Sequence, residues 1–106
     1  MLKIYDVILG VVRDLKPVMT AIEQRDADLA RQMRRAASSV ALNTAEGMYS
    51  GGRNKGARYQ NALGSMRETL ACVEVGTALG YVDAIDAGLE DRIRKVIGTL
   101  ARLIAR

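Results

Sequence analysis

The 106-residue sequence contains no histidine, no tryptophan and no phenylalanine, and only one cysteine. The lack of histidine removes the side chain that most often acts as a general base or a metal ligand. With Cys72 alone, no internal disulfide can form, and we expect a reducing, cytoplasmic setting. No group in the sequence around Cys72 would lower its pKa, which favours a packed thiol over a nucleophile. These absences predict a protein that is not an enzyme and holds no metal or cofactor.

Long apolar runs are also missing, whereas helix-favouring residues are frequent. No stretch of about eighteen apolar residues occurs, so no membrane span is expected. Alanine, leucine, arginine, methionine and glutamate are common, and Pro17 is the only proline. Apolar residues recur at intervals of three and four, which is the helical period. We therefore predict one all-α domain over residues 1–106, an antiparallel up-down-up-down four-helix bundle joined by short links.

Capping residues set the expected bounds of the first two helices. The first helix is predicted over residues 3–22, with a bend at Pro17 because proline has no amide hydrogen to donate. Asp26 or Asp28 can cap the second helix, since a short carboxylate accepts hydrogen bonds from free amides. That helix is expected to reach about Met48.

Similar signals delimit the third and fourth helices. Asn54 can cap the third helix, and Gly80 is the expected residue just after its end. Asp83 with Asp86 resembles a capping box at the start of the fourth helix. The intervening segment Gly51–Gly56 is glycine-rich, and we interpret it as a flexible link or, less favourably, as a loop that holds a phosphate.

The net charge is +4, and the positive excess lies in residues 31–58, where Glu46 is the only acidic residue. A solvated helix surface explains any one basic group, but the clustering favours contact with an RNA or DNA backbone. Because no run of aromatic residues is available to stack bases, we expect salt-dependent backbone contact without sequence-specific reading of a single strand. The candidate nucleic-acid-binding residues are Arg31, Arg34, Arg53, Lys55, Arg58, Lys95 and Arg102.

Polar residues at helical spacing form a further pattern beside the apolar stripes. Two sets share a helix edge: Arg35, Ser39, Asn43 and Glu46, and then Asn61, Ser65 and Glu68. We favour a hydrogen-bonded seam between helices or subunits over a catalytic site, because buried polar groups need partners and no activated group stands among them. A specific hypothesis is that Glu68 pairs with Arg35.

Three segments carry a resemblance to a known family. Residues 35–47 (RAASSVALNTAEG), 62–68 (ALGSMRE) and 79–81 (LGY) resemble the signature of the four-helix-bundle proteins encoded in 23S ribosomal RNA intervening sequences. The resemblance implies a non-enzymatic bundle that assembles as a ring, a homopentamer. A related group, the accessory variability determinant proteins of diversity-generating retroelements, binds a reverse transcriptase and nucleic acid. The motif positions, to which we assign a structural role, are Arg35, Ser39, Asn43, Glu46, Gly47, Gly64, Ser65 and Glu68.

Two functional hypotheses follow from the sequence. The first is a non-catalytic homo-oligomeric scaffold that binds nucleic acid, or a nucleic-acid enzyme such as a reverse transcriptase, through basic surfaces. The alternative is a protein-only assembly or adaptor module without nucleic-acid binding.

Overall fold

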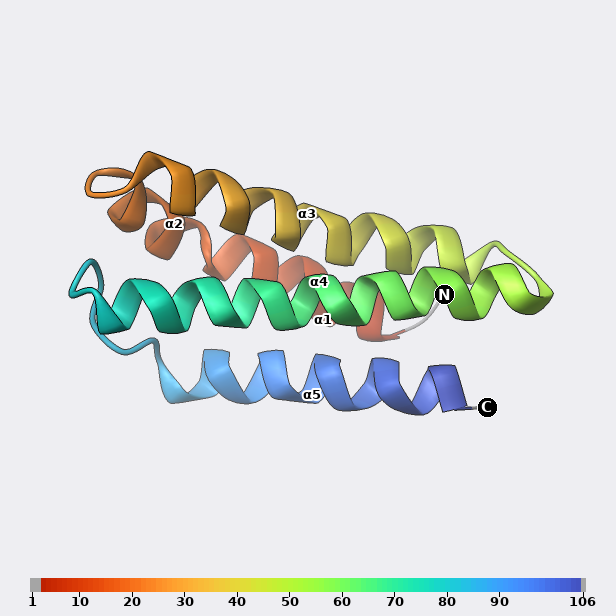
Figure 1. Ribbon diagram of the computed structural model, residues 1–106. Helices are drawn as coiled ribbons and strands as arrows, with labels where there is room; N and C mark the ends of the chain where they lie inside the picture. The colour runs from red at the N-terminus through yellow and green to blue at the C-terminus, as the bar shows by residue number, and fades with distance from the viewer. Residues whose placement is uncertain (1–2, 106) are drawn as a thin grey trace.

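A computed structural model describes residues 3–105, and this part of the chain contains five helices and no β-strand. The helices are α1 (Lys3–Asp14), α2 (Lys16–Glu23), α3 (Ala27–Met48), α4 (Gly52–Ala78) and α5 (Ala87–Ala105). α1 and α2 follow each other as one bent arm, so four arms lie side by side (Figure 1). The all-α prediction is confirmed.

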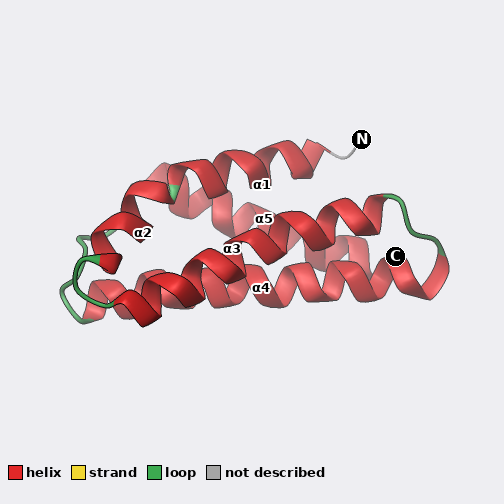
Figure 2. Cartoon of the chain, turned by 90° about the horizontal axis from the view of Figure 1, so that it is seen from above, coloured by secondary structure: helices red, strands yellow, loops and turns green. Residues whose placement is uncertain are grey.

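The helices form an elongated bundle of 43 × 25 × 19 Å. The bent arm of α1 and α2 packs against α3, α3 makes its most extensive contact with α4, α4 packs on α5, and α5 returns to α1. Figure 2, seen from above, shows α3 and α4 running the length of the molecule and joined at one end. No helix within residues 3–105 is long and apolar enough to span a lipid bilayer.

The bend predicted at Pro17 divides the first arm into two helices. α1 ends at Asp14 and α2 begins at Lys16, with Pro17 in its first turn. The amide of Leu15 still donates to Val11, at 2.9 Å, but Pro17 has no hydrogen to continue the ladder. The predicted single helix over residues 3–22 is therefore interrupted at Leu15, whose side chain is fully buried.

The predicted N-terminal cap of α3 is confirmed, whereas that of α4 is wrong. The carboxylate of Asp26 accepts from the amide of Leu29 at 3.0 Å and caps α3. α4, however, begins at Gly52, so Asn54 lies inside its first turn and instead donates to the Ser50 hydroxyl at 3.2 Å. The reason is Gly52 itself, whose φ of 59° is a left-handed value that glycine adopts readily, so the chain turns into the helix three residues early.

α4 ends in the glycine turn that the sequence predicts. Gly80 has a φ of 77°. The amide of Gly80 donates to Thr77 at 3.0 Å and the amide of Tyr81 donates to Gly76 at 2.8 Å. This pair of bonds is a Schellman motif, which satisfies carbonyls at the helix end that would otherwise lack donors.

The predicted capping box before α5 is wrong. Asp86 alone caps the helix, because its carboxylate accepts from the Leu89 amide at 3.2 Å. α5 starts at Ala87, which leaves Asp83 in the exposed connection, too far from the first turn to take part.

The core contains mainly aliphatic side chains and methionine. Small residues on α3 allow α4 to approach closely, and Gly47 gives the tightest contact: a Cβ there would lie 2.5 Å from Cε1 of Tyr59. The largest fully buried side chains include Ile8, Leu15, Ile22, Met33, Met66, Ile93 and Leu100. This close α3–α4 contact sets the geometry of the polar seam between the two helices.

Candidate functional site

The polar seam between α3 and α4 is centred on Ser39. The hydroxyl of Ser65, on α4, donates to the Ser39 hydroxyl at 2.8 Å, which joins the two helices directly. The side-chain amide of Asn43 donates to both the carbonyl and the hydroxyl of Ser39, at 3.0 and 2.9 Å. Three of the predicted motif residues thus meet in one hydrogen-bonded chain, as the seam hypothesis requires.

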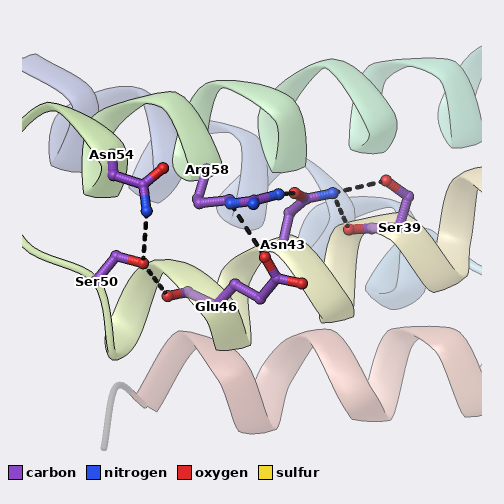
Figure 3. Close-up of polar contacts among 6 residues, drawn as sticks. All are labelled: Ser39, Asn43, Glu46, Ser50, Asn54 and Arg58. Carbon is purple, nitrogen blue, oxygen red and sulfur yellow. Dashed lines mark hydrogen bonds and ion pairs between the residues drawn. The ribbon is translucent and has the colours of Figure 1, made fainter.

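Arg58 extends this seam toward the end of the hairpin. Its Nε lies 3.0 Å from a carboxylate oxygen of Glu46, and its Nη1 donates to the Asn43 side-chain carbonyl at 3.4 Å. Figure 3 shows the guanidinium reaching from α4 across to both α3 side chains. Arg58, predicted as a nucleic-acid contact, therefore also fastens α4 to α3.

The predicted ion pair between Arg35 and Glu68 is wrong for the chain taken singly. Both side chains are exposed, and within residues 3–105 neither takes part in a salt bridge. The contact that joins the helices one turn away is the short Ser39–Ser65 hydrogen bond, and the longer side chains extend into solvent.

A shallow surface groove lies beside the seam and gathers three of the seven predicted basic residues together with Arg35. Three arginines come from the first half of α3 and one from the start of α4. We call this the basic groove; it is lined by Arg31, Arg34, Arg35, Ser38, Ser39, Leu42, Asn43, Glu46 and Arg58. Its lining has four arginines and a single carboxylate, so an anion that enters it meets net positive charge.

Two of the groove arginines have acidic partners just outside the groove. Arg34 lies 2.8 Å from Glu23, and Arg31 pairs with Asp28 one turn before it. All four side chains are largely exposed, and such surface pairs are worth only about 0.2–1 kcal/mol each. Within the described chain Arg35 has no hydrogen-bonding or ionic partner, so it carries the freest positive charge in the groove.

The remaining predicted basic residues lie elsewhere. Arg53 and Lys55 are exposed at the start of α4, at the end of the bundle, and do not line the groove. Lys95 and Arg102 are exposed on α5, which packs on α4 and α1, and they do not line the groove. The structure therefore unites Arg31, Arg34 and Arg58 and separates the other four.

The two motif glycines occupy contrasting surroundings. Gly47 is buried against the ring of Tyr59, where no larger residue fits without movement. Gly64 is exposed, and nothing lies within 4 Å of where its Cβ would be. Gly47 has a packing role inside the chain, whereas the chain itself gives no reason for glycine at position 64.

Cys72 on α4 is a free, buried cysteine whose reactivity is low. Burial raises the pKa of the Cys72 thiol, and the negative charge of Glu68 adds to the effect, so the nucleophilic thiolate is disfavoured. Residues 3–105 contain no cluster of three or more side chains suited to hold a metal ion.

Comparison with known proteins identifies the family. A model of the 23S rRNA-intervening sequence protein family matches residues 2–102, nearly the whole chain. The chain belongs to this family. No curated protein matches the sequence.

A solved structure supports the fold of this 23S rRNA-intervening sequence protein. The chain is similar to a protein of unknown function from the S23 ribosomal protein family of Bacteroides thetaiotaomicron, with a TM-score of 0.81 and 14% identity. The match covers 97% of this chain and 99% of the other. At this identity, the similarity shows a shared fold.

Sequence reasoning missed several residues of the groove. Ser38 and Leu42 line it, and the Asn43–Arg58 hydrogen bond connects residues fifteen positions apart in the sequence. The helical spacing of Ser38 and Leu42 with Arg31 and Arg35 was the available signal for these two residues. No local pattern predicts the Asn43–Arg58 hydrogen bond, because it depends on how α4 lies against α3.

Proposed function

We propose that this 23S rRNA-intervening sequence protein is a non-catalytic scaffold that assembles into a ring, a homopentamer. Its basic groove binds the backbone of RNA or DNA, or a nucleic-acid enzyme such as a reverse transcriptase. The observation that carries the proposal is the convergence of Arg31, Arg34, Arg35 and Arg58 on one groove. Of the two partner classes, the groove chemistry favours nucleic acid.

The arginines suit a phosphate backbone in both chemistry and placement. A guanidinium donates two parallel hydrogen bonds to phosphate oxygens, and exposed carboxylate partners are readily exchanged for them. Arg31 and Arg35 are one helical turn apart, about 6 Å along the axis, so they can contact successive phosphates of one strand. Ser38 adds a neutral donor beside them.

Support for self-assembly comes from the outer face of α4. Most helices of this chain bury an apolar stripe and expose polar residues, but α4 also exposes Ala71 and Val75 along one side, and its C-cap residue Leu79 continues that side. Gly64 lies on the same side and leaves room for a neighbouring backbone. A helix that is apolar on more than its core-facing side is typically covered a second time, and repeated head-to-tail contacts close into a ring.

The binding proposal is tested with an RNA duplex at low salt. Arg31→Gln combined with Arg34→Gln should weaken binding about tenfold or more, because each lost arginine removes a phosphate contact. The matched control is Lys16→Gln with Arg94→Gln, which makes the same charge change outside the groove. Fluorescence polarisation measures both. Equal losses in the two double variants would show general charge attraction and reject the groove, and no binding by an intact assembly would favour the protein-only alternative.

The assembly proposal is tested by sedimentation. The wild-type protein should sediment with five times the mass of the 11.5 kDa chain. Val75→Glu with Leu79→Glu should yield monomers, because two carboxylates in a covered interface lose their hydration. Leu9→Glu, an exposed apolar position on α1, is the control and should leave the mass unchanged. A monomeric wild type would refute the ring.

A further inference from the structure

The α3–α4 tip, residues 49–55, contains an exposed aromatic ring outside the basic groove. In Figures 1 and 2 the connection between α3 and α4 projects past the first turn of α1 and the last turn of α5. Tyr49 is 84% exposed there, the most exposed of the large hydrophobic side chains in the described chain. The ring therefore contributes nothing to the core of this chain and is open to a partner.

Two exposed basic residues lie within six positions of Tyr49 in the same tip, and no acidic residue lies among them. Arg53 and Lys55 are exposed in the first turn of α4, and no acidic residue occurs between Glu46 and Glu68 in the sequence. Glu46 itself is bound by Arg58 at 3.0 Å. An anion that approaches the tip therefore meets two exposed cations in the segment that also carries the exposed ring.

The backbone that carries Tyr49 is braced although it is followed by two glycines. The Tyr49 amide donates to the Glu46 carbonyl at 3.2 Å, and the Ser50 hydroxyl donates to the same carbonyl at 2.8 Å. Asn54 in turn donates to that hydroxyl at 3.2 Å, as Figure 3 shows. Because the chain is held on both sides of the turn, binding needs to order little more than the side chains, which reduces its entropic cost.

We propose that the α3–α4 tip binds single-stranded nucleic acid, with a base stacked on Tyr49 and the adjoining phosphates bound by Arg53 and Lys55. This inference rests on the proposed nucleic-acid function and adds a second contact surface with a preference for unpaired strands. Stacking on one aromatic ring tolerates any base, because every base has a π-face, so the tip binds strands without reading their sequence. A base paired within a duplex is already stacked on its neighbours and gains nothing from the ring.

The experiment separates base stacking from phosphate contact. The probes are a fluorescein-labelled oligouridylate of about twelve nucleotides, a strand of equal length that lacks bases, and an RNA duplex. Tyr49→Ala should weaken oligouridylate binding about tenfold, whereas Tyr49→Phe should stay within about twofold of wild type, since the π-face is retained. The abasic strand and the duplex should bind wild type and Tyr49→Ala equally. Arg53→Gln with Lys55→Gln should weaken the oligouridylate and the abasic strand alike.

The outcomes distinguish this inference from the proposed function. If the duplex binds but Tyr49→Ala leaves oligouridylate affinity unchanged, the tip inference is wrong and the groove proposal stands. A change in sedimentation mass in Tyr49→Ala would assign the ring to a subunit contact and also overturn the inference. Failure of the wild-type protein to bind any of the three probes would reject the nucleic-acid function itself.

Discussion

Replacing Gly47 by alanine tests whether the close approach of α3 and α4 determines the packing behind the basic groove. A Cβ at this position would lie 2.5 Å from Cε1 and 2.8 Å from Cδ1 of Tyr59. The ring of Tyr59 is only 4% exposed, so it has little free space into which to move. Accommodation therefore requires a shift of the ring or of one helix.

Two opposing effects set the size of the change. Alanine is about 1 kcal/mol better than glycine in a helix interior. Overpacking a tight core costs about 1–3 kcal/mol, and a contact this short belongs in the upper half of that range. We expect a net loss of about 1–2 kcal/mol in the free energy of unfolding. At Gly56, inside α4, nothing lies within 4 Å of a Cβ, so the same substitution should stabilise by about 1 kcal/mol.

Urea unfolding followed by far-ultraviolet circular dichroism measures both variants, at one fixed chain concentration because assembly is linked to stability. A third measurement places Gly47→Ala in a Tyr59→Ala background, where the clash is gone and alanine should become stabilising. The reasoning is refuted if Gly47→Ala stabilises the otherwise unchanged protein as much as Gly56→Ala does.

Three further predictions concern acid stability, thiol reactivity and the seam. A hydrogen bond from Arg92 lowers the pKa of Asp14 below its ordinary value of 3.8. This pair therefore stabilises the fold at neutral pH, and its contribution is lost as the pH falls through the lowered pKa. Arg92→Gln should shrink the difference in urea midpoint between neutral pH and about pH 3; an unchanged difference would contradict this. Burial raises the pKa of Cys72, and iodoacetamide should alkylate it at least about tenfold more slowly in the native protein than in urea, as followed by mass spectrometry; equal rates would show an accessible thiolate. Ser65→Ala removes the hydrogen bond to Ser39 and should lower the unfolding free energy by about 1 kcal/mol; a neutral effect would mean that the seam adds no stability.

The helices and several of their ends could be predicted from local sequence. The bend at Pro17, the cap at Asp26 and the glycine turn at Gly80 each depend on one residue and its immediate neighbours. Apolar spacing likewise indicated an all-helical chain, because residues at the helical period share one face.

Features that depend on neighbouring segments were predicted less well. Asn54 is a good cap by type, but Gly52 turns the chain earlier and places Asn54 inside α4. Arg35 and Glu68 have the right charges and lie near the Ser39–Ser65 contact, yet no pair forms between them in the described chain. Ion pairing across helices depends on side-chain reach and helix rotation, which spacing within one helix does not specify.

The same limit applies to the basic groove. The sequence identified Arg31, Arg34 and Arg58 as basic residues of one charged segment, and the antiparallel return of α4 brings Arg58 beside α3. Arg53, only five residues earlier, lies outside the groove. Charge in a sequence predicts the sign of a surface, whereas the packing of the helices decides which charges share it.

The most direct test of the basic groove is the salt dependence of RNA duplex binding. Arg31→Gln, Arg34→Gln and Arg35→Gln together should make the plot of log binding constant against log salt concentration less steep by about one unit per arginine, because each bound phosphate releases counterions. If wild type and the triple variant give the same slope, the groove does not contact the phosphate backbone and the account is contradicted.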